Sequence, residues 1–441
     1  MSQGADRVWS VTEHLNSVLG RLAPLERIEL QLLDAQGCVL VEDVTVPVAL
    51  PPFENSSMDG YAVRTADVAA ATREHPAVLD VIGDVAAGAG ELPTVGPGQS
   101  ARIMTGAPLP PGAEAVVPVE WTDGGTGGGP AAAMAPRASD PRGASGEVRV
   151  HRPAQSGQFV RARGSDAAAG ELALAAGTVL GPPQIGLLAA IGRGTVAVRP
   201  RPRVVVLSTG SELVQPGEEL RPGSIYDSNS FALTAAARAA GAIAYRVGAV
   251  TDEVETLRAT IEDQLIRADM IVTSGGVSVG AYDVVKEALS TLGGSFGDQA
   301  EDSAGFVEFR RLAMQPGKPQ GFGRIGPDRV PLFALPGNPV SAYVSFELFV
   351  RPAIRTLMGA ATVHREVVRA VCVVGIEESP SGKRQYLRGH YDRMTGTVTP
   401  VGGSGSHLVK ALAHADALIV VPEADTSVAA GAEVDVILLD Q

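Results

Sequence analysis

Apolar side chains near the start of the chain recur at helical spacing. Beginning with Val11, they return every few residues as far as Leu22, and this period predicts an amphipathic helix over residues 11–22. Ser10 and Glu13 stand at the two positions of a capping box, in which each side chain binds the other residue's main-chain N–H. The helix is therefore expected to begin directly after Ser10.

Short apolar runs separated by glycine and proline characterise residues 46–163. The runs at 78–82, 101–104 and 115–119 are rich in valine, isoleucine and alanine, so we predict a β-rich module there. Residues 121–147 interrupt it with glycine and alanine tracts that hold few large apolar side chains. A segment of that composition cannot bury enough apolar surface to pack, and we predict a mobile loop insertion.

Strand and helix patterns alternate from residue 199 to residue 359. Short apolar runs lie at 204–207, 270–273 and 331–335. The stretches with helical spacing are 231–240, 254–266, 284–292 and 340–358. Such alternation predicts βαβ units, and hence a doubly wound parallel sheet covered by helices on both faces.

The helical signal ends at Gly359, and short strand patterns follow. They lie at 367–374, 397–400, 417–421 and 433–439 and predict a small C-terminal β-barrel. The expected fold class is α/β plus β in a multidomain chain. The predicted domains are an N-terminal linker domain of residues 1–45 with 164–198, the β-rich module of residues 46–163, an α/β domain of residues 199–359 and a β-barrel of residues 360–441.

Composition and charge narrow the class of protein. The chain has 441 residues and a formal net charge of −13, which disfavours general binding to nucleic acid or anionic membranes. Residues 1–10 lack the basic start and apolar stretch of a secretory signal, and no run approaches the roughly 20 apolar residues of a membrane span. The 2 cysteines and 7 histidines show neither disulfide nor zinc-ligand spacing. We therefore expect a cytoplasmic protein.

The loops after the strands of the α/β domain are the predicted ligand site, because ligands of open parallel sheets bind outside the carboxyl ends of the strands. These loops are Ser208–Glu212, Thr251–Asp252, Thr273–Gly280 with Asp283, and Leu335–Pro339. Thr273–Gly280 is a Gly/Ser-rich turn between a strand and a helix, and its free N–H groups suit a phosphate. A plain connection that needs glycine for positive φ explains the same pattern equally well.

Acidic side chains in these loops suit a divalent cation. Glu212, Asp252 and Asp283 offer the hard oxygen ligands that Mg²⁺ prefers beside phosphate and water. Each also has a simpler interpretation, since Asp252 suits the cap of the next helix and Glu212 a solvated turn. Asn338 and Pro339 likewise suit the cap and first turn of a helix without any ligand.

Basic residues suggest where an oxyanion would bind. Lys318 lies in the rigid turn Gln315–Pro319, where its ammonium would meet a phosphate or another oxyanion, although an exposed lysine is the commoner case. Lys383–Arg388 and the Gly/Ser loop Gly402–His407 would bind a terminal phosphate, or else Lys383–Arg388 is a basic strand edge that deters aggregation. The residues alone thus predict a magnesium-assisted site for a phosphorylated small molecule.

A set of motifs in fixed order resembles the molybdopterin molybdenumtransferase family, which includes the bacterial MoeA proteins and the E domain of gephyrin. The resemblance spans nearly the whole chain. The motifs are Pro52–Ala62, Arg102–Pro108, Gly164–Asp166, Ser208–Glu212, Asp227–Asn229, Ser274–Gly280, Pro316–Pro319, Pro336–Pro339 and Gly405–His407. Gln315 departs from the pattern, because many relatives have lysine there.

The resemblance implies an activity and a site. Such enzymes insert molybdenum from molybdate into adenylylated molybdopterin and release AMP, with Mg²⁺ as cofactor, and they form a homodimer whose site is shared between subunits. The implied catalytic residues are Asp59, Thr105 and Asp166, acting in trans, with Glu212, Asp252, Asp283 and Lys318. Glu212 and Asp283 are the expected metal ligands. The implied substrate-binding residues are Ser274, Gly275, Gly276, Ser278, Gly280, Pro336, Gly337, Asn338, Pro339, Arg388 and Ser406.

Two alternatives remain open from the sequence. A molybdopterin adenylyltransferase would resemble only residues 197–359, and such an enzyme is also a conceivable partner that supplies the substrate. A gephyrin-like scaffold would not need the acids, yet Asp59, Asp166, Glu212 and Asp283 are all present. The full set of motifs therefore favours the transferase.

Overall fold

The computed structural model describes residues 7–134, 146–251, 253–276, 285, 287–288 and 306–439. It consists of two compact units. Unit 1 comprises residues 1–41, 177–181 and 195–441, and unit 2 comprises residues 42–176 and 182–194. The multidomain α/β plus β class is confirmed, whereas the finer division into four domains stays a prediction.

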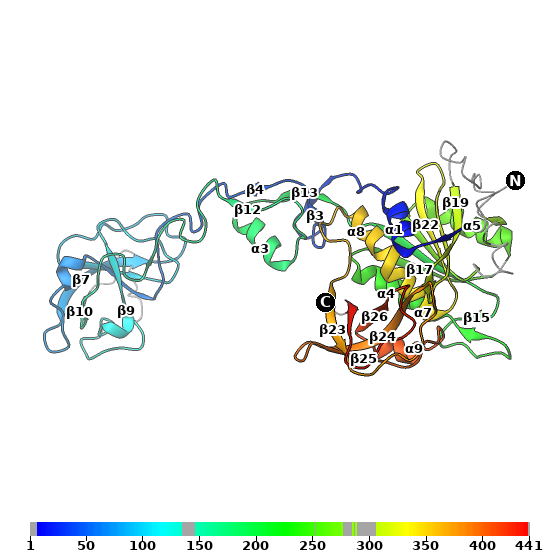
Figure 1. The fold of residues 1–441 in the computed structure, drawn as a ribbon. Coiled ribbons are helices and arrows are strands. Elements are labelled where there is room, and N and C mark those ends of the chain that lie inside the picture. The colour runs from blue at the N-terminus through cyan, green and yellow to red at the C-terminus, as the bar shows by residue number, and fades with distance from the viewer. Residues whose placement is uncertain are drawn as a thin grey trace. The chain divides into compact units, whose positions relative to one another are not determined.

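A seven-stranded sheet forms the centre of unit 1 (Figure 1). Its strands, in spatial order, are β1 (Val8–Trp9), β19 (Phe306–Leu312), β21 (Pro319–Ile325), β22 (Val330–Leu335), β18 (Met270–Ser274), β14 (Arg203–Thr209) and β17 (Ile243–Val250). The four strands from β22 to β17 are parallel, as predicted. The predicted parallel sheet is confirmed in these four strands, whereas β21 runs antiparallel to both β19 and β22 and makes the whole sheet mixed.

The sequence of β21 lacks an apolar strand pattern because close packing requires glycine within this strand. A Cβ on Gly323 would lie 2.2 Å from the Phe306 carbonyl oxygen, so glycine is required where the two strands meet. Glycine and proline weaken the sequence pattern at this strand while the tertiary pairing still forms it.

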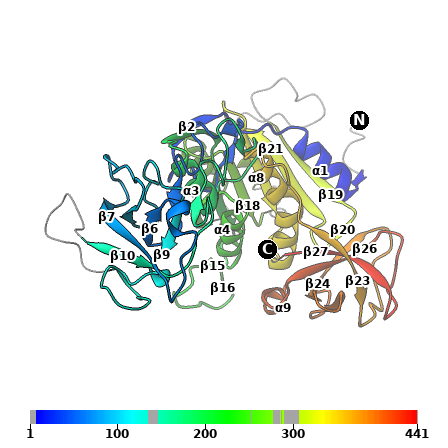
Figure 2. The same ribbon diagram turned by 90° about the vertical axis from the view of Figure 1, so that its left-hand side faces the viewer.

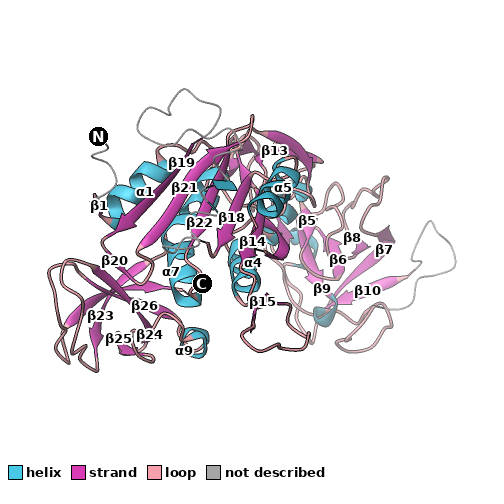
Figure 3. Ribbon diagram, turned by 90° about the vertical axis from the view of Figure 1, so that its right-hand side faces the viewer, coloured by secondary structure: helices cyan, strands magenta, loops and turns pink. Residues whose placement is uncertain are grey.

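Helices cover both faces of the sheet, as the alternation predicted (Figure 3). Val204 and Val206 of β14 face the core that holds α4 (Asn229–Ala239), and Val205 and Leu207 face the core that holds α5 (Val254–Leu265). Helix α1 (Val11–Leu19) packs with the first core. Its capping box is confirmed, since the Glu13 N–H donates to Ser10 Oγ at 3.1 Å and the Ser10 N–H donates to Glu13 Oε2 at 2.9 Å.

The long helix predicted over residues 340–358 is divided into three segments. They are α7 (Pro339–Ser345), a π-helical turn Phe346–Val350 and α8 (Arg351–Leu357). Pro352 has no N–H to donate to the preceding turn, which accounts for the change of helical pitch. The helix predicted at 284–292 falls mostly outside the described residues.

The C-terminal part of unit 1 is a closed five-stranded β-barrel, as predicted (Figure 2). Its strands are β23 (Val367–Cys372), β24 (Arg384–Asp392), β25 (Thr397–Pro400), β26 (Ala417–Val421) and β27 (Glu433–Leu438), with α9 (Val409–Ala413) beside them. β24 pairs with both β25 and β26 and closes the ring. Strand β20 (Met314–Gln315) pairs with β24 and joins the barrel to the chain segment before β21. Unit 1 also contains the short parallel pair β15 (Leu213–Val214) and β16 (Ile225–Tyr226).

A small three-stranded sheet completes unit 1. Strand β13 (Thr195–Arg199) lies between β2 (Ile28–Gln31) and β3 (Val39–Leu40) and is antiparallel to both. Among the described residues, no helix combines the length and apolar character that a membrane span requires.

Unit 2 is mostly β-structure, as predicted. Its main sheet has the order β10 (Glu147–Val150), β7 (Ala77–Val85), β8 (Gln99–Ile103), β6 (Gly60–Val63) and β9 (Ala115–Pro118). The pairs β5 (Asn55–Ser56) with β11 (Val160–Arg161) and β4 (Val44–Thr45) with β12 (Leu172–Leu174), the helices α2 (Thr65–Val68) and α3 (Pro182–Ala190), and the 3-10 turn Val119–Trp121 complete it.

The predicted mobile insertion at 121–147 is wrong at its start. Trp121 packs against the core of unit 2, its ring 5.4 Å from that of Phe159, and Asp123 is buried with 1% of its surface exposed. The Asp123 carboxylate accepts hydrogen bonds from main-chain N–H groups of the glycine tract that follows. Backbone amides thus anchor a segment that has few apolar side chains, and residues 135–145 lie outside the described residues.

Candidate functional site

Three neighbouring parallel strands end side by side in unit 1. Ser208 of β14 is in register with Ser274 of β18, and Ser274 is in register with Leu335 of β22. The loops that follow these strands therefore emerge at one edge of the sheet. This is the edge at which the sequence predicted a ligand site.

The side chain of Asn229, the first residue of α4, links two of these loops. Its Nδ2 donates to Ser274 Oγ at 2.8 Å and to the Gly337 carbonyl oxygen at 2.6 Å. Ser274 Oγ in turn donates to the Pro336 carbonyl oxygen at 3.2 Å. The structure thereby brings Ser274, Pro336 and Gly337 together. Asn229 itself was quoted only within a motif and was given no role from the sequence.

Glycine is required where the loops touch. A Cβ on Gly275 would lie 2.4 Å from the Thr209 carbonyl oxygen, and one on Gly276 would lie 2.2 Å from Val285 Cγ2. Both glycines have positive φ, +99° and +68°. The positive φ that this turn was predicted to need is therefore confirmed at both glycines, while phosphate binding stays a prediction. Ser278 and Gly280 lie outside the described residues.

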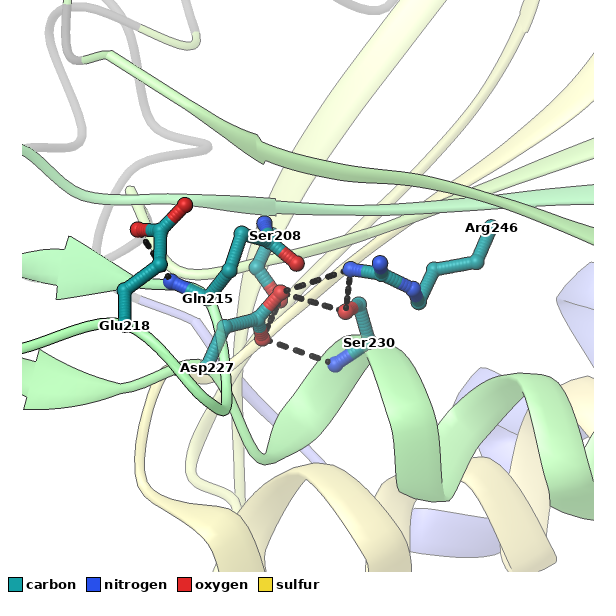
Figure 4. Close-up of polar contacts among 6 residues, drawn as sticks. All are labelled: Ser208, Gln215, Glu218, Asp227, Ser230 and Arg246. Carbon is teal, nitrogen blue, oxygen red and sulfur yellow. Dashed lines mark hydrogen bonds and ion pairs between the residues drawn. The ribbon is translucent and has the colours of Figure 1, made fainter.

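A buried carboxylate anchors the start of α4 (Figure 4). Asp227 is 1% exposed. Its Oδ1 accepts from Ser208 Oγ at 2.8 Å and from the Ser230 N–H at 3.0 Å, and its Oδ2 accepts from Ser230 Oγ. Arg246 Nη1 lies 3.7 Å from Oδ2 and 3.3 Å from Ser230 Oγ. This network fixes the backbone from which Asn229 extends.

Glu212 follows β14 at the same edge. Its side chain is exposed, and its carboxylate lies over Gly210, where a Cβ would come within 2.6 Å of Glu212 Oε2. The other two predicted acids, Asp252 and Asp283, lie outside the described residues. Within the part of the chain that the structure describes, no three His, Cys, Asp or Glu side chains form a metal-binding group.

Lys318 lies on a turn that hydrogen bonds from the Gln320 side chain hold in place. Gln320 is 2% exposed, and its Nε2 donates to the Gly317 carbonyl oxygen at 2.7 Å and to Ser345 Oγ of α7 at 2.6 Å. The Lys318 side chain is exposed. The rigid turn predicted around Lys318 is confirmed, and the contact of its ammonium with an oxyanion stays a prediction.

Arg388 is buried rather than exposed to a ligand. It is 1% exposed and donates through Nη2 to the Gly403 carbonyl oxygen. Burial lowers the pKa of its guanidinium. The same loop reaches α7, where the Ser406 carbonyl oxygen accepts from the Val340 N–H at 3.0 Å. Arg388 therefore supports the loop that carries Ser406.

The N-terminus of α7 matches the structural interpretation of its sequence. Asn338 is the cap residue and Pro339 occupies the first turn, as predicted. The Asn338 side chain makes no capping hydrogen bond, so the helix start depends on backbone conformation and proline.

Asp59, Thr105 and Asp166 belong to unit 2. Asp59 Oδ1 accepts from the Thr105 N–H at 2.6 Å and from Thr105 Oγ1 at 2.8 Å. Asp166 is exposed on another loop, and its N–H donates to the Leu50 carbonyl oxygen at 2.9 Å. The structure therefore brings Asp59 and Thr105 together and places Asp166 on a separate segment.

Known protein families match the chain in three successive stretches. Residues 9–192 match the MoeA N-terminal region (domain I and II), residues 205–356 a probable molybdopterin binding domain, and residues 377–439 the MoeA C-terminal region (domain IV). The adenylyltransferase alternative would account for the middle stretch alone.

Full-length relatives agree with these matches. The chain is 43% identical to molybdopterin molybdenumtransferase 2 of Mycobacterium tuberculosis, over 97% of this chain and 98% of the relative. It is 34% identical to the molybdopterin molybdenumtransferase of Bacillus subtilis, over 92% and 89%. A crystal structure of a molybdopterin biosynthesis MoeA protein from Pyrococcus horikosii has 32% identity and a TM-score of 0.73, covering 99% of this chain and 100% of that one.

Proposed function

The chain belongs to the MoeA family of molybdopterin molybdenumtransferases, the enzymes that insert molybdenum into adenylylated molybdopterin, and we propose that it carries out this transfer at the strand-end loops of unit 1. The observation that carries the proposal is the Asn229 amide, which joins the Ser274 and Gly337 loops at the edge where open α/β sheets bind ligands. An adenylyltransferase would supply the substrate.

The chemistry requires a site that holds two anionic groups. The two thiol groups of the dithiolene form two Mo–S bonds with molybdate, and their two protons leave with one molybdenum-bound oxygen as water. Water adds across the P–O–P bond, which releases AMP and leaves the pterin phosphate. Main-chain N–H groups of the glycine loops suit the phosphates, and Lys318 on its rigid turn suits an oxyanion. Ser274 and Gly337 keep the two loops in place during these steps.

Mg²⁺ fits the residues present. Magnesium is usually held by one or two carboxylates together with substrate phosphates and water, and the exposed Glu212 carboxylate lies directly after β14 at this edge. We propose Glu212 and Asp283 as its ligands and Asp252 as a further catalytic acid. When bound, the ion would offset charge on the bridging phosphates.

We further propose that a homodimer is the active form and that Asp59, Thr105 and Asp166 act on the substrate bound by a second copy of the chain. The contacts of Asp59 with Thr105 support a catalytic role, since two donors hold its carboxylate in one orientation. Asp166 is exposed and accessible to a ligand.

Release of AMP tests the activity. The purified chain, supplied with adenylylated molybdopterin, molybdate and Mg²⁺, is expected to release AMP and to form molybdenum cofactor. Glu212→Gln is expected to raise the Mg²⁺ concentration needed for half-maximal rate by roughly tenfold or more, whereas Glu219→Gln, an exposed acid in the same segment, should match the wild type. AMP release no greater than in a buffer control would reject the function.

Mixed dimers test the shared site. At an Mg²⁺ concentration that saturates the wild type but not Glu212→Gln, Asp59→Asn and Glu212→Gln should each have little activity alone. Their heterodimer should recover part of the wild-type rate, because one of its two sites then contains neither change. Folded heterodimer without any recovered activity would contradict a site shared in trans.

A further inference from the structure

The amide of Asn229 is the point at which three segments of unit 1 meet. The residue itself begins α4, its Nδ2 contacts Ser274 at the end of β18, and the same nitrogen contacts Gly337 after β22. These partners lie 45 and 108 residues away in the sequence. A single side-chain group therefore bridges two loops that also meet directly, through Ser274 Oγ and the Pro336 carbonyl oxygen.

The chemistry of the partners fixes the orientation of this amide. A carbonyl oxygen such as that of Gly337 only accepts hydrogen bonds, so the NH₂ group and not the amide oxygen must face it. The two N–H bonds of Nδ2 satisfy Gly337 and Ser274 at once. An aspartate at this position would have the same shape but would turn an oxygen toward the Gly337 oxygen.

The base of Asn229 is also rigid. Asp227, two residues earlier, is buried and bound to Ser208, Ser230 and Arg246. Gly337 also lies close to Gly275, since an added Cβ on Gly337 would be 3.4 Å from the Gly275 Cα. The two loops therefore have little room to approach each other further. The amide thus helps to fix the distance between the two loops.

We propose that Asn229 is a positioning residue for the transfer reaction: its amide holds the Ser274–Gly276 and Pro336–Gly337 loops in one arrangement, so that both bind the same phosphorylated ligand. The inference rests on the proposed function, because it names what aligns the loops of that site. Asn229 acts through the loops and takes no part in bond making.

Asn229→Asp provides the sharpest test, since it keeps the shape and removes the donor. Above the pKa of the new carboxylate, repulsion from the Gly337 oxygen separates the loops, and the KM for adenylylated molybdopterin should rise on the order of tenfold to a hundredfold. The same repulsion raises the pKa of that carboxylate. Once protonated it can donate to Gly337, so the KM should return toward the wild-type value as the pH is lowered through that pKa.

Charged groups near the new carboxylate enter this expectation. Among the described residues beside the start of α4, they are Asp227 and Arg246, and these two are paired with each other.

Two further variants separate positioning from folding. Asn229→Ala removes the bridge without adding repulsion, so the KM should rise about three- to tenfold at every pH. Ser228→Ala is the matched control, because Ser228 precedes Asn229, is exposed and makes no capping bond; its KM should equal that of the wild type. All three should melt within a few degrees of the wild type, in contrast to a merely structural defect.

The outcomes distinguish the two proposals. A wild-type enzyme without AMP release rejects the proposed function. An active wild type with an unchanged KM in Asn229→Asp overturns the positioning role alone. Should Asn229→Asp fail to fold, Asn229→Ala decides: a raised KM with wild-type melting supports the role, and an unchanged KM overturns it.

Discussion

The two units each contain a buried aspartate, and the two carboxylates are satisfied in different ways. Asp227 and Asp123 are both 1% exposed. In unit 1, Asp227 binds two serine hydroxyls, one N–H and Arg246, which come from strands and a helix of the central sheet. Three of these four partners are side-chain groups.

In unit 2, Asp123 binds main-chain N–H groups. Its Oδ1 accepts from Gly125 at 2.9 Å and from Arg149 at 3.0 Å, and its Oδ2 accepts from Gly127 at 2.9 Å. Gly125 and Gly127 have positive φ, +79° in both cases, which allows the chain to wrap around the carboxylate.

The difference shows what each network stabilises. Hydrogen bonds between the aspartate and other side chains hold one backbone segment in a defined position. In this way the Asp227 network positions Asn229. Main-chain partners need only a flexible tract of chain, so Asp123 closes a loop and requires no other side chain. We therefore expect changes at Asp227 to affect the reaction, and changes at Asp123 to affect stability alone.

The largest expected effect is that of Asp227→Ala. Removing the carboxylate leaves Arg246 and two serines without their partner, which should lower the free energy of unfolding by about 2–4 kcal/mol. Because α4 loses its anchor, AMP release should fall together with stability. Thermal unfolding and the AMP assay measure both, and a variant with wild-type turnover would contradict the role given to Asp227.

Two glycine substitutions compare the loops of the two regions. Gly275→Ala places a Cβ 2.4 Å from the Thr209 oxygen at a φ of +99°, and the displaced loop should lower kcat/KM roughly tenfold or more. Gly127→Ala meets no atom within 4 Å at a φ of +79°, so it should cost only about 1 kcal/mol of stability. Equal loss of kcat/KM in both variants would remove the distinction between the loops.

The effect expected for Asp123→Asn is on stability alone. The amide oxygen retains two of the three donors, and the new NH₂ group faces the Gly127 N–H, so unfolding should become easier by about 1–2 kcal/mol. The kcat and KM for AMP release should not change. A loss of activity as large as that of Asp227→Ala would show that the Asp123 loop also serves the reaction.

Local sequence patterns predicted the parts of the fold that depend on local chemistry. The Ser10–Glu13 cap and the alternation of β14, β18 and β22 with helices both follow from neighbouring residues, and the structure confirms them. The antiparallel strand β21 was not predicted, because its glycine and proline residues give no strand pattern. The strand forms through tertiary pairing, which a local pattern does not show. Pro352 interrupted a helix whose apolar period continues across it.

The candidate site was predicted to a similar extent. The strand-end rule selected the loops that contain Ser274 and Gly337. The bond through Asn229 was missed, because it joins residues 45 and 108 positions apart and leaves no periodic pattern. Arg388 is buried and supports the Gly403 loop, and its contact with a phosphate stays a prediction.

The position of β13 between β2 and β3 affects how the chain folds during synthesis. Both outer strands leave the ribosome before any of unit 2, but the strand that pairs with them follows it. At about 5–20 residues per second, translation of the intervening segment takes on the order of ten seconds or more. During that time the edges of β2 and β3 have no β13 partner, so the nascent chain would gain from a unit 2 that folds quickly and on its own.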